Sequence, residues 1–170
     1  MTYADVLSGE VYINVNPKIT TSEGSVLGEE SVSHKIIKNL TDGSGSNAAT
    51  GFFSSSLTVT TGGVTISLAN ADPFGAAGDD APTMSAEGLK LKCILFENQD
   101  TTNYVSVKKG TLGEASVFSG GTDSVVITAG GFVLWYSPAG VSAMNDGVDD
   151  EFLLTANTSS CVCRITYVFG

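Results

Sequence analysis

The chain of 170 residues has few of the side chains from which active sites are built: it holds one histidine, one tryptophan, three cysteines and a single arginine, Arg164. A catalytic site needs a nucleophile, an acid or a base that converge in one cleft. No stretch of normal helical length repeats its apolar residues with a helical period. These absences argue against a helical domain, and they lead us to expect that the protein is not an enzyme and binds no cofactor.

Basic charge is also scarce, since 8 Lys and Arg stand against 18 Asp and Glu, for a net charge of −10. Contact with a phosphate backbone requires clustered Lys and Arg, and the lysines here are scattered, so we expect no direct nucleic-acid partner. The opening sequence MTYADVLSGEVYINV has neither a basic segment nor a long apolar run. We therefore expect no signal peptide and no contact with a membrane.

The three cysteines are an odd set, and two of them, Cys161 and Cys163, alternate on one strand. Two cysteines on the same face of a single strand have poor geometry for a mutual disulfide. We therefore interpret Cys93, Cys161 and Cys163 as small buried apolar residues of a protein in a reducing compartment.

The chain consists instead of short β-rich runs separated by Gly, Asn, Asp and Ser. This pattern predicts an all-β fold, either an antiparallel β-sandwich or a jelly-roll-like barrel of about nine or ten strands. Residues 1–30 are expected to form an N-terminal arm or edge strand, and residues 31–170 a single β-sandwich domain. Four short turns predict that successive strands pair as hairpins. The expected hairpins join Phe52–Thr61 to Gly63–Leu68, Leu89–Asn98 to Asn103–Lys108, Ser124–Thr128 to Phe132–Ser137, and Glu151–Thr155 to Cys161–Phe169.

Three features of the sequence could indicate a catalytic, nucleotide-binding or metal site, and each has a simpler interpretation. His34 lies in an expected strand, and no G-x-S-x-G nucleophile motif accompanies it. Gly43–Ala48 fits the spacing G-x-G-x-x-A, but a strand and not a helix is expected after it. The acidic groups at Asp79-Asp80 and Asp146–Glu151 do not match an EF-hand and are interpreted as solvated loops. We therefore predict no catalytic, cofactor or metal residues. Trp135 lies in a strongly apolar strand, which favours a core or subunit contact over a sugar platform.

From about Thr41 to the end, the order of several short motifs resembles a family of small tailed-bacteriophage virion proteins of the capsid decoration, or cement, type. The resemblance covers roughly three quarters of the chain and depends on order and spacing, since each motif alone is weak. The motifs are Asp42–Ala49, Leu57–Leu68, Asp72-Pro73-Phe74-Gly75, Leu89–Asn98 followed by Thr102–Val105, Ile127–Phe132 with Ser137-Pro138, and Phe152–Ser160 with the strand that ends at Gly170.

The resemblance implies a virion structural protein, made in the host cytoplasm, that binds the outside of the shell formed by the major capsid protein and stabilises it. It favours a homotrimer, because trimers suit local three-fold positions of a shell. The alternatives are a tail, collar or fibre component of the virion, or a carbohydrate-binding β-sandwich module. Contact is expected through the N-terminal arm and through the loops 69–88 and 141–150. The candidate interface residues are Tyr3, Val6, Tyr12, Phe74, Met84 and Met144.

Overall fold

A computed structural model describes residues 9–15, 34–42, 46, 48–68, 88–110, 123–140 and 151–170, and every structural statement below concerns these residues. They contain eleven β-strands and no helix, so the all-β prediction is confirmed for this part of the chain. The strands are β1 Gly9–Val15, β2 His34–Asp42, β3 Ala48–Ala49, β4 Gly51–Val59, β5 Val64–Ser67, β6 Leu91–Asn98, β7 Val105–Lys109, β8 Ser124–Ile127, β9 Phe132–Tyr136, β10 Glu151–Ala156 and β11 Cys161–Phe169.

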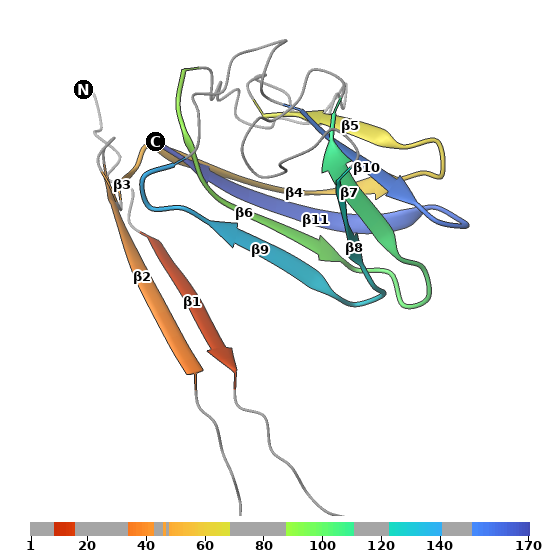
Figure 1. The fold of residues 1–170 in the computed structure, drawn as a ribbon, viewed down its shortest axis with the longest axis horizontal. Helices are drawn as coiled ribbons and strands as arrows, with labels where there is room; N and C mark the ends of the chain where they lie inside the picture. The colour runs from red at the N-terminus through yellow and green to blue at the C-terminus, as the bar shows by residue number, and fades with distance from the viewer. Residues whose placement is uncertain are drawn as a thin grey trace, which may run out of the picture.

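Eight of these strands form two four-stranded antiparallel sheets (Figure 1). We call the sheet with the order β4-β11-β6-β9 sheet I, and the sheet with the order β5-β10-β7-β8 sheet II. Strand β11 lies inside sheet I, where it pairs with β4 on one side and with β6 on the other.

The four expected hairpins are wrong, because each of them joins strands that belong to different sheets. Strand β4 pairs with β11 and its successor β5 pairs with β10, while β6 pairs with β9 and β7 pairs with β8. A turn between strands of two different sheets favours the same residue types as a turn between neighbouring strands of one sheet. The sequence therefore predicts the positions of the short connections correctly, but not the pairing of the strands beside them.

Among β4–β11, the first strand pairs with the last, the second with the second-last, and so on inward to β7 and β8. The chain thus forms one long antiparallel ribbon, doubled back between β7 and β8. The ribbon then rolls up, so that β11 also lies beside β6 and β10 also lies beside β7.

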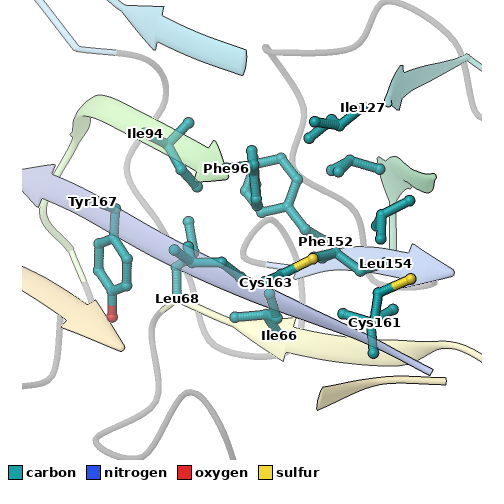
Figure 2. Close-up of a cluster of buried hydrophobic side chains, with 14 of the residues drawn as sticks. Ile66, Leu68, Ile94, Phe96, Ile127, Phe152, Leu154, Cys161, Cys163 and Tyr167 are labelled. Atoms are coloured by element: carbon teal, nitrogen blue, oxygen red, sulfur yellow. The ribbon is translucent and has the colours of Figure 1, made fainter. Parts of the chain in front are cut away.

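Alternation along the strands builds the core between the two sheets. In β11, the side chains of Cys161, Cys163, Ile165, Tyr167 and Phe169 are buried, whereas Val162 and Arg164 are exposed. The buried residues of both sheets form one hydrophobic cluster (Figure 2). Phe96 of sheet I meets Phe152 of sheet II edge to face, with ring centroids 5.4 Å apart. Burial of a large apolar side chain of this kind stabilises the fold by about 1.5–3 kcal/mol.

Strands β1, β2 and β3 form a separate sheet, in which β1 is antiparallel to β2 and β3 is parallel to the end of β2. Figure 1 shows the β1–β2 ribbon extending away from sheets I and II. Strand β3 is anchored beside the last residue of the chain, since a Cβ added to Gly170 would lie 2.9 Å from the Cα of Ala49. The segment 41–50 thus contains the end of β2 and the short strand β3.

Candidate interaction surfaces

The candidate interface residues predicted from the sequence fall largely outside the described residues. Tyr3, Val6, Phe74, Met84 and Met144 all do so. Tyr12 lies in β1, where the register places it opposite Ile37 of β2, and its side chain is not described. The described residues therefore do not test these six positions, which remain predictions.

The residues considered for chemistry give no site in the described part of the chain. His34 is the first residue of β2 and pairs with Val15. The Gly-rich and acidic loops lie mostly outside the description, apart from Glu151 at the start of β10. Among the described residues no group of three or more His, Cys, Asp and Glu is placed to hold a metal ion. Within the same ranges, no helix is long and apolar enough to cross a membrane.

The cysteines are buried and free, which confirms their interpretation as small core residues. Burial disfavours the charged thiolate and raises the pKa of Cys93 to about 11. Burial also raises the pKa of Cys163 to about 12, with a smaller contribution from Cys161. Because the thiolate is the nucleophile, Cys93 and Cys163 are poorly suited to react near neutral pH.

One end of the two sheets is closed by four short connections that are hydrogen-bonded to one another. The N–H of Gly130 donates to the carbonyl of Asp100, and the N–H of Ala156 donates to the carbonyl of Thr60. The amide of Asn103 donates to the hydroxyl of Ser159 at 2.9 Å. Buried Asn98 joins two of these connections, because its amide donates to the carbonyl of Asn103 and to those of Ile127 and Thr128. We call this region the short-loop end.

The opposite end of the sheets receives every other connection. The strand ends that flank residues 69–87, 111–122 and 141–150 lie there, and so do β3 and the last residue of the chain. At this end Gly170 exchanges backbone hydrogen bonds with Lys90, and the Lys92 ammonium donates to the carbonyl of Pro138. Burial, with a smaller effect of Lys90, lowers the pKa of Lys92. We call this region the long-loop end.

The outer face of sheet I changes character from one edge to the other. On the β4 side it carries exposed hydroxyls at Ser54, Ser56 and Thr58, and the hydroxyls of Ser54 and Thr166 are 2.7 Å apart. The opposite edge is formed by β9, with the sequence FVLWY, in which Phe132 is 64% exposed and the other four residues are half-buried. Trp135 of this strand packs against the core, as does Val133.

The β9 edge is the surface that reasoning from the sequence did not single out. Trp135 was interpreted correctly as a core or contact residue, but the strand as a whole was assigned to an ordinary hairpin. A usable signal was present, because no charged residue occurs between Asp123 and Asp146 in a chain with 26 charged residues. An uncharged apolar edge strand is unusual, since natural edges are normally protected by charges or proline.

No family model matches the chain, and no curated protein matches it.

Proposed function

We propose that the protein is a structural protein of a phage virion, and specifically a decoration protein that binds the outside of the shell formed by the major capsid protein. The motif order described above supports this proposal. The strand order supports it further, because a doubled ribbon of eight strands in two sheets fits the jelly roll, an architecture used by viral capsid proteins among others. A shared architecture does not define function by itself, so the site must carry the argument.

The observation that carries the proposal is the difference between the two ends of the fold. The short-loop end is held by hydrogen bonds between its own connections and offers little freedom to adapt to a partner. The strand ends that flank residues 69–87, 111–122 and 141–150 lie at the long-loop end, and these stretches include segments expected to make contact. A protein whose expected contact loops begin and end at the same end of its sheets suits docking on a large surface.

Stabilisation of a shell follows from mass action. A ligand that binds only the assembled shell adds its binding free energy to the stability of that shell. A homotrimer would place three long-loop ends on a local three-fold position at once, and the gain in avidity would strengthen weak individual contacts.

The proposal is tested by adding the purified protein to expanded shells that lack decoration. We expect the protein to sediment with the shells to a saturable stoichiometry, and to raise the temperature at which the shells break open. A variant without residues 1–45 serves as the control, since it retains every residue of the core cluster and lacks the N-terminal arm; it should bind more weakly. Absence of binding at saturating concentration would remove the proposal.

A further inference from the structure

The β9 edge of sheet I has backbone groups that point away from the sheet. The N–H of Asn98 donates to the carbonyl of Gly131 at 2.9 Å, and the N–H of Ser137 donates to the carbonyl of Lys92 at 2.8 Å. In an antiparallel pair, residues bonded to the neighbouring strand alternate with residues whose N–H and C=O point outward. The register between β9 and β6 is regular from Phe132 to Tyr136. Val133 and Trp135 therefore bond to β6, whereas Phe132 and Leu134 direct their backbone groups away from it.

The strand order of sheet I ends at β9, so the described residues place no strand beside Phe132 and Leu134. Outward-pointing backbone groups in an extended strand are matched best by another extended strand. The partner that this edge fits is therefore a β-strand, and the question is which one.

The distribution of charge on the chain favours a second copy of this chain as the partner strand. Two copies, each with a net charge of −10, repel one another over most of their surfaces. The β9 edge lies within one of two long uncharged stretches of the chain, between Asp123 and Asp146, and the other runs from Gly43 to Ala71. A basic partner would instead be attracted to surfaces that bear carboxylates. An uncharged apolar edge therefore suits contact between two identical acidic chains.

We propose that β9 pairs with β9 of a second copy in an antiparallel, two-fold arrangement that joins the two copies of sheet I into one continuous sheet. The two-fold axis passes beside Val133, so that Phe132 of each copy lies opposite Leu134 of the other. Each such pair exchanges both of its outward backbone hydrogen bonds. Because the contact uses the same edge of both copies, it closes on itself and leaves no open strand at this side for further growth.

This contact is separate from shell binding and concerns the isolated protein, but it excludes an isolated homotrimer: the trimer proposed above would have to be one half of a hexamer. A two-fold contact cannot close a trimer. The assembly in solution must therefore contain an even number of chains: a dimer, or a hexamer if a separate three-fold contact also exists. Light scattering of the full chain at increasing concentration measures this number directly.

The first variant is Leu134→Lys, which places on the edge a charge of the kind that natural edge strands use to prevent pairing. We expect it to halve the mass and to leave the melting temperature of the separated chain nearly unchanged. The matched control is Val126→Lys, on the edge strand β8 of sheet II, where Val126 is 54% exposed. This control should keep the wild-type mass.

The second variant is Val133→Cys, which tests the register even if Leu134→Lys disturbs folding. The axis places the two Val133 residues opposite one another as a non-hydrogen-bonded pair, with Cα atoms about 4.5 Å apart. That separation is within the range that a disulfide spans. Mild oxidation should therefore link two chains covalently, whereas Val126→Cys should not be linked. The buried thiols of Cys93 and Cys163 should not interfere, because burial raises their pKa.

A wild-type protein that stays monomeric or trimeric at the highest attainable concentration would overturn the proposal. So would a mass that Leu134→Lys leaves unchanged, or an even-numbered assembly in which Val133→Cys forms no intermolecular disulfide. Failure to bind shells would leave this contact unaffected, since shell binding is measured separately.

Discussion

Two glycines follow one another in the turn between β4 and β5, and only one of them must be glycine. The N–H of Gly63 donates to the carbonyl of Thr60, and Gly63 has a φ of 87°, in the left-handed region that L-residues avoid. A Cβ at Gly63 would also lie 2.9 Å from Cδ1 of Leu153, whereas a Cβ at Gly62 would make only an ordinary contact with Thr60. Gly63→Ala should lower the free energy of unfolding by about 1–2 kcal/mol or more. Gly62→Ala should leave it unchanged or raise it by up to about 1 kcal/mol. Urea denaturation of both variants checks this, and equal effects would contradict the turn geometry.

Asp100 provides a pH-dependent contribution at the short-loop end. Its carboxylate accepts hydrogen bonds from the backbone N–H groups of Asn103 and Thr102, at 2.7 and 2.8 Å, and these bonds lower its pKa. A carboxyl with a lowered pKa in the folded state stabilises the fold above its unfolded pKa of about 3.9, and this effect is lost as the pH falls through the folded pKa. Asp100→Asn should therefore lower the melting temperature at about pH 5 and have much less effect near pH 2. If Asp100→Asn lowers the melting temperature by the same amount at both pH values, this role of Asp100 is refuted.

At the level of elements, the order of the strands can be tested by two engineered disulfides. Thr58 of β4 pairs with Val162 of β11, and both side chains are exposed. The hairpin predicted from the sequence would instead place Thr58 opposite Thr65, which the structure assigns to sheet II. The double variant Thr58→Cys with Val162→Cys should oxidise readily and raise the free energy of unfolding by about 2–4 kcal/mol. The pair Thr58→Cys with Thr65→Cys should remain reduced, and its ready oxidation would favour the hairpin.

The strands themselves could be predicted from the sequence, whereas their partners could not. The alternation in Cys161–Phe169 identifies a strand and its buried face, because it depends only on the period of two in a strand. The same buried face is compatible with a neighbour in the same sheet and with a neighbour across the core. The choice between them depends on contacts such as that of Phe96 with Phe152, which are distant in the sequence. The β9 edge could not be recognised for the same reason, since an edge is defined only once the order of the strands is known.

At the level of the whole molecule, the core cluster formed by the described side chains contains no residue of β1 or β2. Every residue of the core cluster lies between Val59 and Phe169, and the closely anchored Ala48 and Ala49 precede β4 directly. A chain that starts at Ser46 should therefore retain cooperative unfolding, with a melting temperature within about 4 °C of the full chain, equivalent to about 1 kcal/mol. Circular dichroism during heating measures this. A loss of cooperative melting would show that β1 and β2 belong to the same folding unit.

The position of β11 has a consequence for how the protein is made. This strand is the last of the described strands to be synthesised, yet it lies between β4 and β6 and supplies a partner to both. Until it leaves the ribosome, β4 has no neighbour in sheet I, and the core lacks Ile165, Tyr167 and Phe169. Pairings between strands so distant along the chain form slowly. The nascent polypeptide must therefore carry its early apolar strands, such as β4, without their partners through most of translation, and we expect this interval to be the one in which chaperones are needed most.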